Sequence, residues 1–140
     1  VASDADFEAN AKGRSVKVIS AVECRVLGSE SLIQSAVENV LRNAVRYTRE
    51  GTEVEVSLTN GGGVAKLRVV DHGSGVPEAE LNNLFRPFYR VGEARDRGSG
   101  GTGLGLAIAE QAILAHKGSI KARNTDDGLE VEISLPCVTR

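Results

Sequence analysis

A glycine-rich segment that runs into an apolar helical segment constrains this chain more than any other feature. Glycines are interspersed with Ser99, Thr102 and Leu104 across residues 98–105, and an apolar segment at 107–116 follows. Glycine permits positive φ and lets a ligand approach the main chain closely. The first turn of a helix presents unpaired N–H groups and the positive end of the helix dipole, which favour an anion such as phosphate. The segment therefore predicts a phosphate-binding loop at a helix N-terminus.

Hydrophobic periodicity divides the rest of the chain into strands and helices. Alternating, β-branched segments predict strands at residues 16–22, 53–59, 64–70, 120–123 and 129–135. Helical spacing predicts helices at residues 30–46, 77–84 and 103–116, the first capped by Ser29 and the last capped near Gly118. Asn-Gly-Gly-Gly at 60–63 predicts a hairpin turn. We expect an α+β two-layer sandwich, with a mixed, mostly antiparallel sheet and helices on one face.

Length and charge narrow the class of protein. The 140 residues fit a single domain, and the formal net charge of −2 gives no reason to expect binding to nucleic acid or to an anionic membrane surface. No apolar run approaches the roughly 20 residues of a membrane-spanning helix, and the start lacks the pattern of a signal peptide. Because the chain starts at Val1 and contains no Met, we expect a fragment of a longer protein.

The glycine spacing alone does not identify the ligand. Gly98-x-Gly100-x-x-Gly103 matches the dinucleotide-binding pattern, but that pattern requires a strand directly before the glycines. Here residues 85–102, rich in arginine and glycine and without a sustained period, predict a long loop. A protein-kinase glycine loop should lie between two strands and be followed by a strand lysine, and this segment does neither. The sequence also contains no P-loop pattern. A surface loop without a ligand stays open as the alternative.

A carboxylate is predicted at the end of a strand, in the sequence Asp-His-Gly-Ser-Gly at 71–75. Asp71 can accept a hydrogen bond from an exocyclic amine such as that of adenine, and Gly73 and Gly75 leave space for a flat base. The alternative is an ordinary β-turn with Asp at its first position. No role is predicted for His72.

One face of the predicted helix 30–46 is polar. Asn39, Asn43 and Arg46 are spaced so that they share a face, and Tyr47 follows them. Amide oxygens bind Mg²⁺, whereas amide N–H and guanidinium groups hold phosphates. A solvated polar face is the alternative. Together with Asp71 and the glycine segment, this face would complete a site with base, metal and phosphate positions.

Four motifs, in this order, resemble the nucleotide-binding boxes of sensor histidine kinases. Glu-Asn-Val-Leu-Arg-Asn-Ala-Val-Arg-Tyr-Thr at 38–48 resembles the N box, and Asp71-x-Gly73-x-Gly75 resembles the G1 box. Phe-Arg-Pro-Phe-Tyr-Arg at 85–90 resembles the F box, and Gly-Thr-Gly-Leu-Gly-Leu at 101–106 resembles the G2 box. Within the family, residues 88–103 resemble the Cpx-type envelope-stress sensors. The resemblance covers nearly the whole chain.

The resemblance implies a fold and an adenine site. The fold would be the Bergerat fold, which sensor histidine kinases share with gyrase B, Hsp90 and MutL (the GHKL group). Asp71 would bind the adenine amine, Gly73 and Gly75 would shape the pocket, and Tyr47 would line the adenine or ribose side.

The resemblance also implies the metal and phosphate contacts. Asn39 would be the main protein ligand of Mg²⁺, and Asn43 and Arg46 would face the phosphates. Residues 85–102 would form the ATP lid, with Arg90, Arg95 or Arg97 available to the β- and γ-phosphates. The other nucleotide-binding residues would be Phe85 in the F box and the G2-box residues Gly101, Thr102, Gly103, Leu104 and Gly105.

The implied reaction is transfer of the ATP γ-phosphoryl group to a histidine on a separate dimerisation helix, for relay to a response regulator. No catalytic residue is expected in this chain, because neither His72 nor His116 has the sequence context of an acceptor. We expect ATP and Mg²⁺ as cofactors, little autophosphorylation by the chain alone, and a monomer in isolation. Its partners would be the protein's own dimerisation and phosphoacceptor domain and a response regulator. The chain would be the cytoplasmic domain of an inner-membrane sensor kinase.

Two other functions stay open. An ATP-hydrolysing protein like gyrase B, Hsp90 or MutL would need a glutamate base where Asn39 stands, and an amide cannot accept that proton. Glu38 is one position earlier, about 100° around the helix, and should point elsewhere. An anti-sigma-type serine kinase would share the ATP site. The extended F box and the arginine-rich lid favour the sensor-kinase branch.

Overall fold

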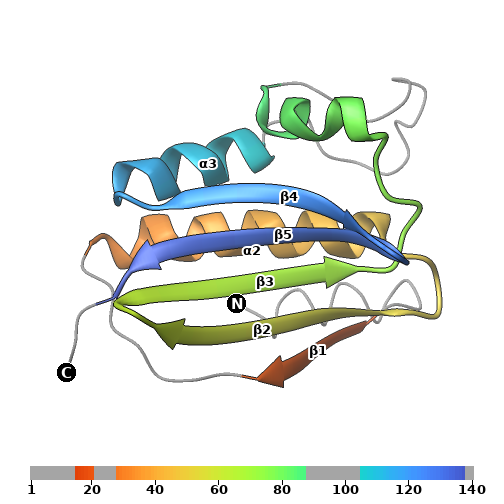
Figure 1. Ribbon diagram of the computed structural model, residues 1–140, viewed down its shortest axis with the longest axis horizontal. Helices are drawn as coiled ribbons and strands as arrows, with labels where there is room; N and C mark the ends of the chain where they lie inside the picture. Colours follow the sequence, from red (N-terminus) through yellow and green to blue (C-terminus); the bar gives the residue numbers. More distant parts are fainter. Residues whose placement is uncertain (1–14, 21–27, 88–104, 138–140) are drawn as a thin grey trace.

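The computed structural model describes residues 15–20, 28–87 and 105–137, which form five strands and three helices (Figure 1). The strands are β1 (Ser15–Ser20), β2 (Glu53–Gly61), β3 (Val64–Asp71), β4 (Ser119–Thr125) and β5 (Gly128–Pro136). The helices are α2 (Glu30–Tyr47), the 3-10 helix η1 (Glu78–Phe85) and α3 (Gly105–Ala115). Every predicted element is present, although the helix predicted at 77–84 is a 3-10 helix that begins after Pro77. No helix in these ranges combines the length and the apolar character needed to span a membrane.

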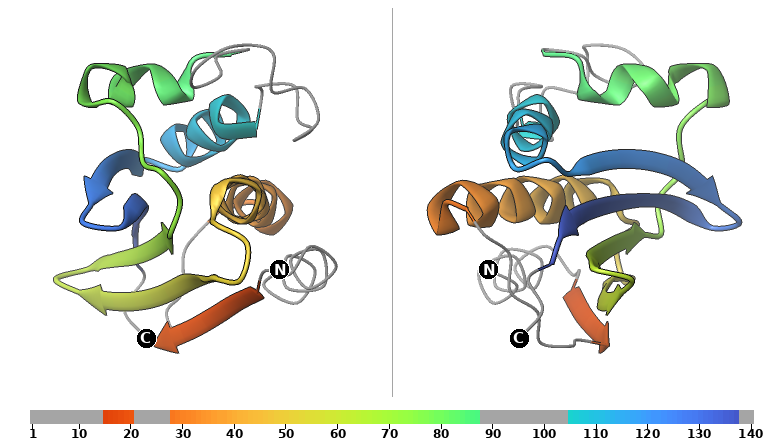
Figure 2. Two further views of the ribbon diagram at one scale, coloured as in Figure 1. Left: turned by 90° about the vertical axis from the view of Figure 1, so that its right-hand side faces the viewer. Right: turned by 60° about the vertical axis from the view of Figure 1, so that its left-hand side comes forward.

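The strands form one sheet in the order β1-β2-β3-β5-β4. β1 pairs in parallel with β2, and the other neighbours are antiparallel. α2 and α3 contact each other and lie on the same face of the sheet (Figure 2). The prediction of a mixed, mostly antiparallel sheet with helices on one face is confirmed.

The hydrophobic core lies between the helices and the sheet. α2 begins where Ser29 Oγ accepts a hydrogen bond from Leu32 N, which confirms the predicted cap. One stripe of the helix is buried in a cluster with residues of α3 and of the central strands: Ala36, Val40, Leu41, Ala44, Val45, Val54, Val69, Ile113, Val131 and Ile133. This packing fixes the rotation of α2, so that Asn39 and Asn43 lie half-buried at the border of the stripe.

Two glycines form the turn between β2 and β3. Gly62 and Gly63 have φ of 62° and 78°. Positive values at both central residues are the requirement of a two-residue type I′ turn. The predicted hairpin is confirmed, and its turn is shorter than residues 60–63 because β2 extends to Gly61.

α3 ends in a turn whose left-handed residue is a lysine. Lys117 has φ of 64°, its N–H donates to Leu114 O at 3.0 Å, and Gly118 N donates to Ile113 O at 2.9 Å. These bonds form a Schellman motif, in which the left-handed position is usually glycine. The capping position expected near Gly118 is therefore held by Lys117. Gly118 meets a different requirement, because a Cβ there would lie 2.3 Å from Ser134 O.

Lys117→Gly is expected to raise the free energy of unfolding by about 1 kcal/mol, because glycine adopts positive φ without the steric strain of a Cβ. Urea unfolding followed by circular dichroism measures the change. Gly118→Ala is the matched comparison and should lower the free energy of unfolding, since its Cβ meets Ser134 O. A Lys117→Gly protein no more stable than the parent would contradict the assignment of strain to Lys117.

His116 connects the end of α3 to the start of α2. Its Nε2 accepts a hydrogen bond from Ser29 N at 3.0 Å, and its Nδ1 lies 2.7 Å from Ala112 O. In this arrangement Nδ1 carries the hydrogen and donates it to the carbonyl. Gly28 packs so closely that a Cβ there would lie 2.0 Å from His116 Cδ2. Both ring nitrogens are therefore engaged: Nδ1 holds the ring on α3, and Nε2 connects it to the cap of α2.

Candidate functional site

Asp71 is a buried carboxylate at the end of β3. It is 3% exposed, and its Oδ1 accepts a hydrogen bond from Gly73 N at 2.9 Å, which forms an Asx turn. Burial raises the pKa of Asp71 above its ordinary value, and hydrogen bonds from the backbone of Gly73 and Leu129 offset part of that shift. A carboxylate offers about four acceptor positions. The bond to Gly73 therefore leaves capacity for an amine donor from a ligand.

The turn after Asp71 requires glycine at two positions for different reasons. A Cβ on Gly73 would lie 2.3 Å from the main-chain oxygen of Tyr47, at the end of α2. Gly75 has φ of 76°, and a Cβ there would lie 3.0 Å from Asn124 Oδ1. Gly73 is thus fixed by close contact with α2, and Gly75 by its backbone conformation.

The residues that follow α2 hold the main chain of the same turn. Thr48 Oγ1 accepts a hydrogen bond from His72 N at 2.9 Å, and Arg49 N donates to His72 O at 3.1 Å. The Arg49 guanidinium also donates to Gly73 O at 3.4 Å. Thr48 is 1% exposed, so water does not compete for its hydroxyl. The end of α2 and the end of β3 therefore form one hydrogen-bonded unit.

Asn124, near the end of β4, holds the far side of the turn. Its Oδ1 accepts from Val76 N at 2.9 Å, and its Nδ2 donates to Val76 O at 2.6 Å. Neither Asn124 nor Thr48 is predicted as a site residue, because each acts on a residue that is distant in sequence. The only sequence signal is a polar residue at the end of a strand or helix, and that signal also fits an ordinary cap or turn.

The predicted polar face of α2 lies beside the start of α3. Asn39, Asn43 and Arg46 are half-buried on α2. A Cβ on Gly105 would lie 3.5 Å from Asn39 Oδ1, so this amide oxygen faces the first residue of α3. In the part of the chain that the structure describes, these three side chains make no hydrogen bond or ion pair with other residues. The structure thus brings Asn39 and Gly105 together, as a shared phosphate or metal site would require.

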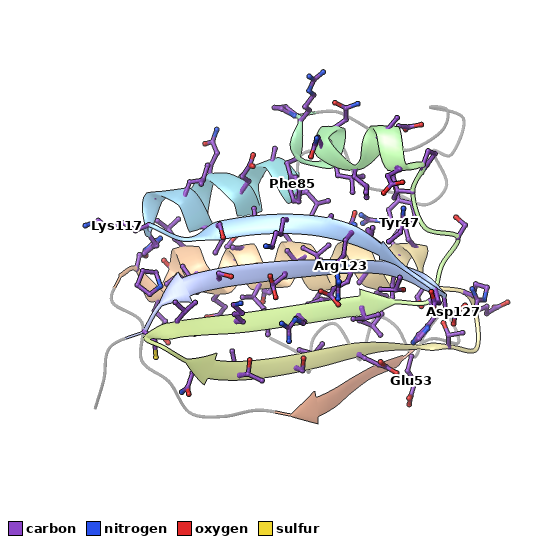
Figure 3. All side chains as sticks on the ribbon, viewed as in Figure 1. Tyr47, Glu53, Phe85, Lys117, Arg123 and Asp127 are labelled. Atoms are coloured by element: carbon purple, nitrogen blue, oxygen red, sulfur yellow. The ribbon has the colours of Figure 1, made fainter. Side chains whose placement is uncertain are left out.

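The two predicted aromatic residues differ in their surroundings. Tyr47 is 38% exposed at the end of α2 (Figure 3). Its main-chain oxygen meets Gly73. Phe85 is the last residue of η1 and packs against the hydrophobic core. The remaining predicted residues lie outside the described ranges: Arg90, Arg95, Arg97, Gly101, Thr102, Gly103 and Leu104.

The polar side chains beside the start of α3 suit a metal ion that is also bound by a second ligand such as a phosphate. Among residues 28–87 and 105–137, no group of three or more His, Cys, Asp or Glu side chains is placed to hold a metal ion. The donor that faces the first residue of α3 is the amide oxygen of Asn39. Mg²⁺ usually keeps several waters and takes one or two protein ligands together with phosphate oxygens. An amide donor next to a helix N-terminus therefore fits magnesium bound to a nucleotide.

Curated relatives match most or all of this chain. The sensor histidine kinase CpxA of Escherichia coli strain K12 is 42% identical over 142 residues, which cover 100% of this chain and 31% of CpxA. The sensor-like histidine kinase SenX3 of Mycolicibacterium smegmatis is 42% identical over 97 residues, or 69% of this chain and 25% of SenX3. The chain spans about a third of the length of the curated relatives that it matches over all of its residues.

Solved structures and a family profile agree with these relatives. The mycobacterial sensor histidine kinase MprB superposes with a TM-score of 0.83 and 29% identity, covering 99% of this chain and 97% of that one. Full-length ShkA in complex with AMPPNP has the same fold, with a TM-score of 0.83 and 24% identity over 99% of this chain and 29% of ShkA. The profile described as histidine kinase-, DNA gyrase B-, and HSP90-like ATPase matches residues 28–139. The chain therefore belongs to the histidine kinase-, DNA gyrase B- and HSP90-like ATPase family and has the GHKL fold of histidine kinase ATP-binding domains.

Proposed function

We propose that this chain is a single domain, the ATP-binding catalytic domain of a two-component sensor histidine kinase. The observation that carries the proposal is the unit around Asp71. A buried carboxylate stands at the end of β3, its turn is held by the residues after α2, and the polar face of α2 lies beside the start of α3. The relatives that match the whole chain are named sensor histidine kinases. The bound AMPPNP in ShkA supports ATP as the nucleotide for the same fold.

In this proposal Asp71 accepts a hydrogen bond from the adenine amine. The low exposure of its carboxylate makes that bond stronger than it would be in water. Gly73 and Gly75 carry no side chain that could block the base, and Tyr47 lies against the adenine or ribose. The predicted contacts of Phe85 and of the lid and G2-box residues complete the nucleotide site.

Phosphoryl transfer depends mostly on positioning and on charge stabilisation. Asn39 would ligate Mg²⁺ through its amide oxygen, and Asn43 and Arg46 would contact the phosphates from the same side of α2. When bound, the metal neutralises charge on the β- and γ-phosphate oxygens. Gly105 opens α3 next to Asn39, so the helix N-terminus adds N–H donors for the phosphate chain.

The acceptor histidine is proposed to lie on the dimerisation helix of the full-length protein. Both ring nitrogens of His116 are engaged, one with Ala112 O in α3 and one with Ser29 N at the start of α2, so it is not available as an acceptor. The partners are then this protein's own dimerisation domain and, through the full-length kinase, a response regulator. Because the relatives are sensor kinases about three times as long, we place the chain on the cytoplasmic side of an inner-membrane sensor kinase, monomeric when isolated.

Incubation with γ-labelled ATP and Mg²⁺ tests the proposal. The chain alone is expected to stay nearly unlabelled, and an added dimerisation domain that carries the acceptor histidine should become labelled. Asn39→Ala is expected to slow that transfer by about 100-fold, since it removes the proposed protein ligand of the metal. Glu38→Gln, one position away, should transfer at the parent's rate. Efficient labelling of the isolated chain, or rapid ATP hydrolysis abolished by Glu38→Gln, would contradict the proposal.

A further inference from the structure

His72 lies between two carboxylates on the outer side of the Asp71 turn. Its Nδ1 is 2.9 Å from Asp127 Oδ2, in the turn between β4 and β5, and its Nε2 is 3.5 Å from Glu55 Oε2 on β2. The side chain is 23% exposed. Both ring nitrogens therefore face negatively charged oxygens, in a residue for which the sequence predicts no role.

The same contacts reach the main chain that carries Asp71. Asp127 Oδ1 is 3.0 Å from the guanidinium of Arg49, and that guanidinium donates to Gly73 O. Asp127 thus bridges Arg49 and His72 beside the turn. Hydrogen bonds from Arg49 and His72 hold the pKa of Asp127 below its usual value. We call His72, Arg49, Glu55 and Asp127 the His72 cluster.

The charge of the ring decides how many of these contacts are favourable. A neutral imidazole has one N–H donor and one acceptor, whereas an imidazolium has two donors. With a neutral ring, one of the two carboxylates faces a nitrogen lone pair. With an imidazolium, Asp127 receives a charge-assisted hydrogen bond, roughly twice as strong as a neutral one, and Glu55 forms an ion pair with the ring at 3.5 Å.

Charged side chains face the His72 ring from each element that packs against it. Glu55 on β2, Asp71 at the end of β3 and Asp127 after β4 are acidic, and the Asp71 carboxylate interacts with the ring through space. Arg49, after α2, is the basic group among them, and its guanidinium is already paired with Asp127. Three acidic groups and one basic group therefore surround the ring.

We propose that His72 is a positioning residue for nucleotide binding, and that its protonation tightens the turn that presents Asp71 and Gly73 to the base. The inference rests on the proposed function, because it takes Asp71 as the residue that binds adenine. ATP affinity should then fall as the pH rises through the range in which histidines titrate, between about pH 5 and pH 8. Asp71 acts in the opposite direction, because its raised pKa weakens binding only as the pH falls.

The test is the ratio of the ATP dissociation constants of His72→Gln and of the parent, measured by calorimetry across this range of pH. The ratio removes the titration of ATP itself, which is the same for both proteins. It is expected to be about 5 at the acid end and to approach 1 at the alkaline end. Asp127→Asn, at an exposed position, should flatten the profile in the same way. Lys121→Gln is the control, because its ion pair with Glu132 lies on the sheet away from the turn.

A second readout separates positioning from a merely structural role. The amide N–H of Gly73, which binds Asp71 Oδ1, should shift in NMR spectra as His72 titrates, and should not shift in His72→Gln. A ratio that is the same at every pH, with Asp71-dependent ATP binding intact, would overturn this inference alone. A parent that binds no ATP, or binds it equally well after Asp71→Asn, would overturn the proposed function instead.

Discussion

Asp71→Asn is expected to weaken ATP binding by about 100-fold, which corresponds to about 2.7 kcal/mol. The amide oxygen of asparagine can still accept the hydrogen bond from Gly73 N, which turns the amide N–H₂ toward the adenine amine. Two donors then face each other, and a buried donor without an acceptor costs about 1–3 kcal/mol. Titration calorimetry with ATP and Mg²⁺ measures the loss. Asp126→Asn is the matched control, because it removes the same charge from an exposed carboxylate of the β4–β5 turn.

The same substitution is expected to leave the fold at least as stable as the parent at neutral pH. Burial raises the pKa of Asp71, so the folded state disfavours the ionised carboxylate relative to the unfolded state. The stability linked to this group is present below the ordinary pKa of 3.8 and is lost as the pH rises through the folded pKa. Asparagine never ionises and avoids that loss.

Urea unfolding of the parent and of Asp71→Asn over a range of pH checks the direction of this stability change. The difference in the free energy of unfolding should grow in favour of Asp71→Asn as the pH rises, and then become constant. A variant that loses stability together with ATP affinity would show that the carboxylate is needed for the fold, which would contradict its assignment as a ligand-binding group.

Gly128→Ala is expected to damage the fold and the site together. A Cβ on Gly128 would lie 1.9 Å from Asp71 O and 2.8 Å from Asp71 C, which are main-chain atoms that cannot rotate away. The ends of β3 and β5, where Asp71 pairs with Leu129, must therefore separate. Such overpacking costs about 1–3 kcal/mol, and it displaces the Asp71 carboxylate. Urea unfolding and ATP titration should both register the change.

Gly61→Ala is the matched control for Gly128→Ala. A Cβ on Gly61 would have no atom within 4 Å, and this glycine has no positive φ. Its free energy of unfolding should stay within about 0.5 kcal/mol of the parent, and its ATP affinity should be unchanged. A Gly128→Ala protein with the same free energy of unfolding and ATP affinity as Gly61→Ala would contradict the close approach of β5 to Asp71.

Periodicity was enough to predict the elements of this fold. The apolar stripe of α2 repeats at helical spacing, and the alternation of β2 and β3 marks which face of the sheet is buried. These signals are local, because burial of one face imposes the period on each segment by itself. Periodicity does not fix the ends of the elements. η1 begins after Pro77 and α3 ends at the left-handed Lys117, and both boundaries depend on neighbouring residues.

The sequence also predicted Asp71, Gly73 and Gly75 as one turn at a strand end, and the structure places them so. It did not predict the residues that hold this turn. Thr48, Asn124 and Gly128 meet it only because α2, β4 and β5 pack beside β3. Such contacts depend on tertiary structure and leave no periodic signal. The nucleotide contacts of Asn39, Asn43 and Arg46 stay predictions that the Asn39→Ala experiment begins to test.

The most direct test of adenine recognition by Asp71 compares ATP with inosine triphosphate, which carries an oxo group where adenine has its amine. The measured quantity is the ratio of the two dissociation constants, in the parent and in Asp71→Asn. The parent is expected to prefer ATP by about 100-fold, because the carboxylate accepts from an amine and is repelled by an oxo group. Asp71→Asn should lose or reverse this preference, since its amide N–H₂ can donate to the oxo group. Equal binding of the two nucleotides by the parent, or an unchanged preference in Asp71→Asn, would contradict adenine recognition by Asp71.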